Sequence, residues 1–261
     1  LSAQFDRVWL TGEKGINNLI AAVVCQKGKW RSGYITSQVG NGSPLEIKIT
    51  PSEKMNGRIV TVWSTDAGET LRSFDVYDLM IGGELSLTGN IDDSGVDSRF
   101  SGNLDVYSYR IVEAPALAKL VSLMALTGIL EALQGEGLAF DALKMPVSHE
   151  SGVLQISDAK ATGASLGFTA SGKIYTHADM VDISGTVVPA YALNSALGNL
   201  PLIGTIFSGG EEGSGVFAAN YVMTGSRNEP EVSINHLSVL APGILRNIFG
   251  AFDEESDFKD D

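Results

Sequence analysis

The chain has 261 residues, with 31 Asp and Glu against 18 Lys and Arg, which gives a formal net charge of −13. This length fits one large all-β unit or two ordinary domains. Thirty Gly, eight Pro and 44% hydrophobic residues are typical of a folded sheet protein with many turns. The acidic balance disfavours nucleic acid as a partner and electrostatic attachment to anionic lipid, because both need clustered Lys and Arg.

Segments in which apolar and polar residues alternate recur along the chain and predict β-strands with one wetter face. They are residues 45–49, 58–63, 84–88, 153–157, 181–184 and 231–234. Gly89 and Gly102 have the same spacing as Gly172 and Gly185, each after Ser or Thr. Strands of roughly ten residues would span about 33 Å, and glycine kinks in long strands favour curved, twisted sheets. We expect a mainly β protein with a long, twisted, curved antiparallel sheet.

Residues 114–134 depart from the strand pattern and predict a helix. Its apolar side chains recur at helical spacing, at Leu117, Leu120, Val121 and Met124. Thr127 and Gly128 predict a bend or a break in this helix. We expect a kinked helix or a helical hairpin that covers the sheet core, and the alternative is an element that contacts lipid.

A second helix is predicted near the C-terminus, with Pro242 in its first turn, where the helix needs no amide donor. Five apolar side chains lie along one side of it, at Ile244, Leu245, Ile248, Phe249 and Phe252. We expect this side to dock on the sheet, with a partner protein or a bilayer surface as alternatives. Residues 253–261 hold six acidic groups and one Lys, which predicts a disordered tail.

These patterns predict one domain over residues 1–252. Its expected parts are a β region at 1–112, a helical insertion at 113–146, a β region at 147–236 with amphipathic segments at 189–207, and a C-terminal helix at 237–252. The tail at 253–261 follows.

Motifs for catalysis are weak in this chain. Residues 163–167 match the G-x-S-x-G pattern, but a strand is expected to follow them where that motif requires a helix. The acidic pairs at residues 92–93 and 211–212 lie among Gly and Ser, which favours solvated loops over a pair of catalytic carboxylates. We therefore expect no catalytic residues and no enzyme activity.

Metal and disulfide chemistry is equally weak. His149, His177 and His236 are far apart and follow no metal-ligand spacing. Cys25 is the only cysteine, which excludes an internal disulfide, and its apolar neighbours predict a buried thiol in a strand. We expect no metal site and no cofactor.

Three stretches in the C-terminal part of the chain resemble a known family. Residues 188–194 read VPAYALN, residues 199–204 read NLPLIG, and residues 240–249 read LAPGILRNIF. Shorter landmarks occur in the same order at residues 65–68, 82–85 and 113–117. Together they resemble the AsmA-like family, in which such segments close large envelope proteins of the YhdP and TamB type, and the likeness covers most of residues 55–250. One departure is His236, where members often carry proline.

The resemblance implies a taco-like β-groove in the periplasm that passes phospholipids between the inner and outer membranes and supports outer-membrane integrity. It also implies that an N-terminal helix, not included in these residues, anchors the full-length protein in the inner membrane. The expected groove residues are Leu85, Leu87, Leu104, Val106, Leu117, Leu120, Val121, Met124, Val181 and Ile183. The C-terminal apolar side chains would contact the outer membrane or an outer-membrane protein.

Two alternatives remain open at the level of sequence. The first is a scaffold or assembly factor for outer-membrane proteins, in which an exposed strand edge pairs with client strands. The second is a cap that closes the groove of the full-length protein.

Overall fold

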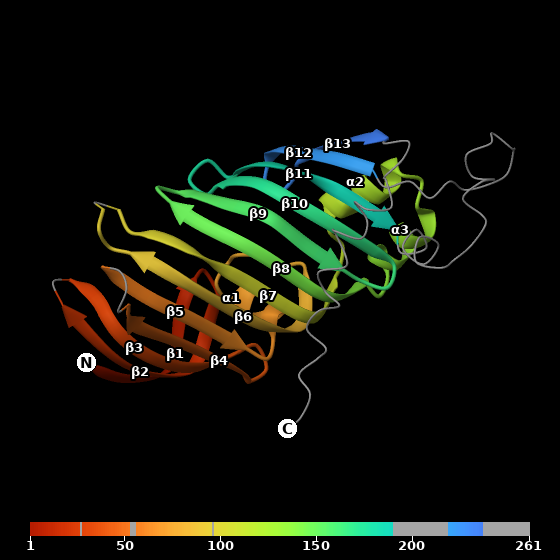
Figure 1. Cartoon of the computed structure of the whole chain (residues 1–261). Helices are drawn as coiled ribbons and strands as arrows, with labels where there is room; N and C mark the ends of the chain where they lie inside the picture. The colour runs from red at the N-terminus through yellow and green to blue at the C-terminus, as the bar shows by residue number, and fades with distance from the viewer. Residues whose placement is uncertain (27, 53–55, 96, 190–218, 237–261) are drawn as a thin grey trace, which may run out of the picture.

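The computed structural model describes residues 1–26, 28–52, 56–95, 97–189 and 219–236. Within them, thirteen strands form one antiparallel sheet and lie side by side in chain order (Figure 1). The strands are β1 (Ser2–Thr11), β2 (Lys14–Gln26), β3 (Lys29–Val39), β4 (Ser43–Pro51), β5 (Gly57–Ser64), β6 (Met80–Asp92), β7 (Arg99–Ile111), β8 (Leu138–Glu150), β9 (Val153–Thr162), β10 (Leu166–Tyr175), β11 (Met180–Pro189), β12 (Ala219–Ser226) and β13 (Glu231–His236). All six alternating segments lie within these strands, so the prediction of a mainly β, antiparallel fold is confirmed.

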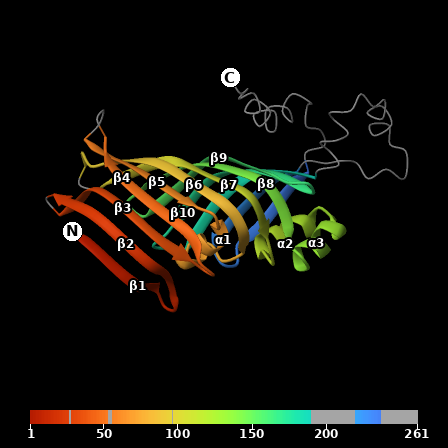
Figure 2. The same cartoon turned by 90° about the horizontal axis from the view of Figure 1, so that it is seen from below.

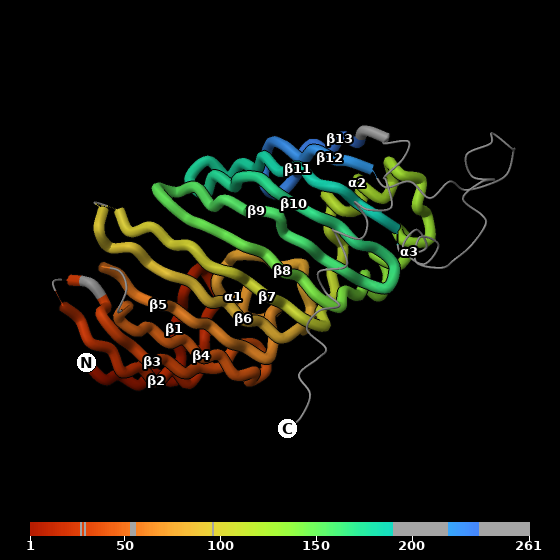
Figure 3. Tube along the Cα trace, in the orientation of Figure 1, coloured from red at the N-terminus to blue at the C-terminus, as the bar shows by residue number. Residues whose placement is uncertain are grey.

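The sheet is twisted and curved along its length, and it stays open among the described residues (Figures 1 and 2). β1 and β13 form its two edges, and no register pairs them with each other. Figure 3 shows the chain passing back and forth along the strands while it advances once from the β1 edge to the β13 edge. The expected long strands are confirmed, because most contain ten to thirteen residues.

Three short helices interrupt the described part of the sheet: α1 (Ala67–Ser73), α2 (Pro115–Leu123) and α3 (Thr127–Gln134). The side chain of Asp66 caps α1 by accepting a hydrogen bond from the Glu69 amide at 2.9 Å. Pro115 opens α2, as its fixed φ favours. The break between α2 and α3 falls at residues 124–126, where Ala125 has a φ of +56°. It therefore precedes the predicted break at Thr127 and Gly128.

One expected boundary is wrong, and one helix was not predicted. The helical insertion does not reach residue 146, because α3 ends at Gln134 and β8 begins at Leu138. The first β region contains the unpredicted helix α1. Of the amphipathic segments at 189–207 only Pro189 is described, and the C-terminal helix at 237–252 and the tail at 253–261 lie outside the described residues.

A meander of this kind places its connections alternately at the two ends of the strands. One end, which we call the hairpin rim, carries the turns that join β2 to β3, β4 to β5, β6 to β7, β8 to β9, β10 to β11 and β12 to β13. The opposite end, the helical rim, carries α1 between β5 and β6, and α2 and α3 between β7 and β8. No described helix is long and apolar enough to span a membrane.

Candidate functional site

One row of residues crosses the sheet from β2 to β13 and contains only apolar residues and glycine. Each member is the register partner of the next, and the row defines what we call the inner face. The members are Val23, Gly33, Ile49, Val60, Gly89, Gly102, Val147, Ile156, Gly172, Ile183, Met223 and Val232. At about 4.8 Å between strands, the row is roughly 50 Å long.

A parallel row on the same face is also wholly apolar. It runs from β1 to β8 through Ala3, Ala21, Ile35, Ile47, Val62, Leu87, Leu104 and Met145. The outer face differs, because its neighbouring row on β3 to β8 reads Thr36, Glu46, Trp63, Ser86, Asp105 and Lys144. The sheet is therefore amphipathic along most of its length.

The glycines of the first row have a packing role on β6 and β7. Gly89 and Gly102 are register partners, and the ring of Phe100 lies over both. A Cβ atom on Gly89 would stand 2.4 Å from Phe100 Cε2, and one on Gly102 would stand 3.0 Å from Phe100 Cζ. The aromatic ring thus fills the space that two side chains would take, and the row stays apolar at this point.

α2 and α3 cover the inner face toward the β13 end. Leu120, Val121 and Leu133 from these helices are buried in one cluster with Val181 and Ile183 of β11. Aromatic contacts extend the cluster across β7, β8 and β10, since Tyr109 stacks on Phe140 with ring centroids 5.3 Å apart and Phe168 meets Phe140 edge-on at 5.6 Å. This part of the inner face is a packed core.

The inner face is more exposed at the β1 end. Ile16, Val39 and Leu45 form a second, smaller buried cluster, and Val62 packs against both clusters. On the edge strand β1, Phe5 is the register partner of the partly buried Leu19 and is 50% exposed. The apolar surface therefore continues from the packed core to an exposed edge.

A network of polar contacts links the turns of the hairpin rim. Two guanidinium nitrogens of Arg58 donate to the two carboxylate oxygens of Asp93 at 2.8 and 2.9 Å, and a third donates to the main-chain oxygen of Trp30 at 3.0 Å. Arg99 donates to Glu150 at 2.7 Å, which joins the β6–β7 turn to the β8–β9 turn. Asp93 was expected in a solvated loop, but its side chain is only 11% exposed because Arg58 covers it.

The same network continues toward β13. Thr176 Oγ1 donates to the main-chain oxygen of Gly152 at 2.9 Å, and Arg227 Nε lies 2.9 Å from Asp179 Oδ1. The guanidinium groups of Arg58, Arg99 and Arg227 are thus all paired with carboxylates. These three cations are engaged within the rim and do not form a cluster for a phosphate group.

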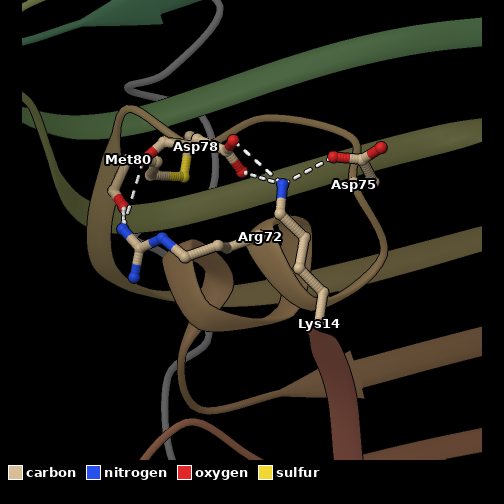
Figure 4. A network of polar contacts seen from close by, with 5 residues as sticks. All are labelled: Lys14, Arg72, Asp75, Asp78 and Met80. Atoms are coloured by element: carbon tan, nitrogen blue, oxygen red, sulfur yellow. Dashed lines mark hydrogen bonds and ion pairs between the residues drawn. The ribbon is translucent and has the colours of Figure 1, made fainter. Parts of the chain in front are cut away.

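At the helical rim, Lys14 joins the start of β2 to the loop that follows α1 (Figure 4). Its Nζ lies 2.5 Å from Asp75 Oδ1 and 3.0 Å from Asp78 Oδ2. The hydrogen bond from Lys14 lowers the pKa of Asp75, and the bond to Asp75 raises the pKa of Lys14. Three strands separate β2 from β6 in the sheet, so this contact requires the sheet to curve around α1.

The ten expected groove residues lie on or against the inner face. Six are buried: Leu85, Val106, Leu120, Val121, Val181 and Ile183. Leu104, Leu117 and Met124 are partly buried and pack against the same cluster, and Leu87 lies between Val62 and Leu104 in the second row. The five expected contact residues Ile244, Leu245, Ile248, Phe249 and Phe252 lie outside the described residues.

Sequence reasoning missed the inner-face residues of β2 to β5, including Val23, Ile35 and Ile49, which are all buried. The alternation at residues 45–49 was a usable signal for Ile49 and its strand. In contrast, the bulges in β2 disturb the alternation around Asn18 and Val24 and hide the pattern there. The ion pairs of the hairpin rim gave no local sequence signal, because their two members come together only when the strands pair in this register.

Other residues with possible chemistry are isolated. Cys25 is exposed, which corrects the expected buried thiol, because it lies beside a register shift at the end of β2. Ser165 lies in the turn before β10, so a strand follows the G-x-S-x-G segment as predicted. Among the described residues, no group of three or more His, Cys, Asp and Glu side chains could hold a metal ion.

Comparison of this chain with protein-family models, with curated proteins and with solved structures finds no match.

Proposed function

We propose that this protein is a non-enzymatic lipid-transport segment in which acyl chains move along the inner face of the sheet. The observation that carries the proposal is the row from Val23 to Val232, which stays apolar across twelve successive strands. A sealed core needs apolar residues only where elements pack against each other. Here the apolar surface extends past the helices to the exposed edge at Phe5.

The hairpin rim supports the same proposal. A phospholipid bound in this way would bury its acyl chains against the inner face and keep its headgroup in water. Because Arg58, Arg99 and Arg227 are paired with carboxylates, these residues offer no site selective for one headgroup. We therefore expect transport of several phospholipid classes.

The choice of membranes in this proposal rests on the resemblance to the AsmA-like family. On that basis the segment works in the periplasm and passes phospholipids between the inner and outer membranes, which supports outer-membrane integrity. No cofactor takes part in this transfer, and its direction is set by other proteins or by gradients.

Native mass spectrometry with lipid extraction tests the proposal on matched variants of β6. Leu87 lies on the inner face and Thr88, the next residue, is exposed on the outer face. We expect the wild-type protein and Thr88→Asp to carry phospholipid and a folded Leu87→Asp to carry much less. A wild-type protein that is free of lipid would contradict the proposal.

The edge strand β1 favours a second candidate function, a scaffold for outer-membrane proteins. In the described sheet, β1 pairs on one side only, with β2, and ten residues of its other side are available for strand addition. Crosslinking from a photoreactive residue at Gln4 distinguishes the two functions. A scaffold would give crosslinks to client strands from this edge and no lipid on the inner face.

A further inference from the structure

Three aromatic side chains on the outer face of the sheet are exposed among polar neighbours. Tyr34 on β3 is 48% exposed, Trp63 on β5 is 37% exposed and Tyr107 on β7 is 39% exposed. Aromatic rings contribute more to binding interfaces than most side chains, and a group of them at a surface marks an interaction site more often than scattered apolar residues do.

A carboxylate lies between each pair of aromatic rings. Tyr34 donates its hydroxyl to Glu46 Oε2 at 3.2 Å, and Trp63 Nε1 donates to Glu84 Oε1 at 2.9 Å. Glu46 is the register partner of Trp63, and Glu84 is the register partner of Tyr107. One residue from each of the strands β3 to β7 thus forms an alternating aromatic and acidic array.

The register sets the shape of this array. Each step from Tyr34 to Trp63 and from Trp63 to Tyr107 crosses two strands and shifts two residues toward the helical rim. With about 4.8 Å between strands and about 3.3 Å per residue, the array is a diagonal strip roughly 23 Å long. The hydrogen bonds to Glu46 and Glu84 fix the polar ends of the first two aromatic side chains, which remain 48% and 37% exposed.

A depression adjoins the strip at its Tyr34 end. It has a volume of about 370 Å³ and is lined by Ala22, Ser32, Tyr34, Lys48 and Thr50 on the outer face, with the backbone of Gly33 and Ile49. Burial against these neighbours, with Glu46 beside the hydroxyl, raises the pKa of Tyr34. The small side chain of Ala22 leaves room here for a substituent on a bound ligand.

We propose that this strip, formed by Tyr34, Glu46, Trp63, Glu84 and Tyr107, binds a linear, uncharged polysaccharide. Pyranose rings would stack on the exposed aromatic faces, and their hydroxyl groups would donate to the carboxylate oxygens that accept no bond from Tyr34 or Trp63. The length of the strip favours an extended polymer.

The charges of the strip argue against other partners. The two carboxylates disfavour an anionic membrane surface or a nucleic acid. A cationic partner would meet Lys48, which is the register partner of Tyr34 and is exposed at the same end. An uncharged partner with many hydroxyl donors fits both the two carboxylates and the aromatic rings.

Retention of the purified protein on chitin and on cellulose tests the proposal, with titration of a soluble chitin hexasaccharide as a second measurement. We expect the wild-type protein to be retained, and Trp63→Ala to weaken binding by at least about tenfold, as the loss of a central Trp contact does. Glu84→Gln should weaken binding less. Trp63→Phe should restore part of it, because an aromatic face remains.

Tyr175→Ala is the matched control, because Tyr175 on β10 is also 37% exposed but lies outside the strip. It should bind like the wild type. The proposal is overturned if the wild type binds neither glycan nor the hexasaccharide, if folded Trp63→Ala binds as well as the wild type, or if retention is lost at high salt, which would indicate a charged partner. The site lies on the face opposite the lipid row, so lipid binding is expected to be unchanged in all these variants, and either proposal can fail alone.

Discussion

Lys119 Nζ donates a hydrogen bond of 3.0 Å to the main-chain oxygen of Pro230, 111 residues further along the chain. Lys119 lies on α2, which leaves the sheet at the helical rim, whereas Pro230 lies in the β12–β13 turn at the hairpin rim. α2 therefore lies across the last strands of the sheet, and its Lys119 side chain reaches the β12–β13 turn. In the proposed function, this arrangement makes the lipid path accessible from the β1 end and closed at the β13 end.

The packing of α2 and α3 on the sheet is expected to contribute strongly to stability. Leu133 is fully buried, so Leu133→Ala should lower the free energy of unfolding by about 2–5 kcal/mol, as cavity-forming substitutions do. Leu123, on the same pair of helices, is 47% exposed. Leu123→Ala should therefore change the free energy of unfolding by less than about 0.5 kcal/mol. Urea unfolding followed by circular dichroism measures both. Equal effects of the two substitutions would show that these helices are not docked as described.

The ion pair between Arg58 and Asp93 is expected to stabilise the hairpin rim. Both side chains are 11% exposed, and Arg58→Ala should cost about 3 kcal/mol because it leaves the Asp93 carboxylate without its bidentate partner. The Arg99–Glu150 pair is a control, because its side chains are 60% and 49% exposed and Arg99→Ala should therefore destabilise the protein much less than Arg58→Ala. Double-mutant cycles on the two pairs give the coupling energies. A larger coupling in the exposed pair would contradict this account of the rim.

Two glycines should respond oppositely to alanine. Gly89→Ala should destabilise the protein, because the new Cβ would stand 2.4 Å from the Phe100 ring and 2.7 Å from the Ser101 oxygen. Gly128 lies in α3 with nothing within 4 Å of a Cβ, so Gly128→Ala should stabilise the protein by up to about 1 kcal/mol through helix propensity. Thermal unfolding measures both changes. An unaffected Gly89→Ala protein would mean that Phe100 does not cover this position.

The contact between Lys14 and Asp75 predicts a pH dependence of stability. The folded-state pKa of Asp75 lies below its ordinary value of 3.8, so its contribution is present above that value and is lost as the pH falls through the folded pKa. The folded-state pKa of Lys14 lies above 10.5, so its contribution is present below that value and is lost at higher pH. The difference in unfolding free energy between the wild type and Asp75→Asn should therefore be constant between about pH 5 and 9 and decrease below pH 4.

Lys14→Met provides the control for this pH effect. Both single substitutions remove the same contact, although Asp78 also accepts from Lys14. In a variant that carries both substitutions, Asp75→Asn should add little to the effect of Lys14→Met. A difference between wild type and Asp75→Asn that persists unchanged at pH 3 would show that Asp75 is not bound by Lys14.

The strands were the part of the fold that could be predicted from sequence, because alternation along one strand reports directly which face is apolar. Residues 84–88 and 181–184 show this for β6 and β11. The helix α1 was missed because seven residues are too few for a clear helical period. Its capping residue Asp66, with Glu69 three positions later, was the available signal.

Contacts between distant segments could not be predicted in the same way. The Arg58–Asp93 pair and the Lys119–Pro230 bond depend on the sheet register and on its curvature, which no local pattern encodes. The aromatic strip has the same origin, since Tyr34, Trp63 and Tyr107 are far apart in the chain and become neighbours only across β3 to β7.

The most direct test of lipid transport is photocrosslinking of a labelled phospholipid from single positions along the inner row. A photoreactive residue would replace Val60 or Val147 on the inner face, and Thr61 or Ser148 on the outer face of the same strands. The account predicts lipid crosslinks from both inner positions and none from either outer position. An absence of crosslinks from the inner positions in folded protein, or equal crosslinking from the two faces, would contradict a lipid path along this sheet.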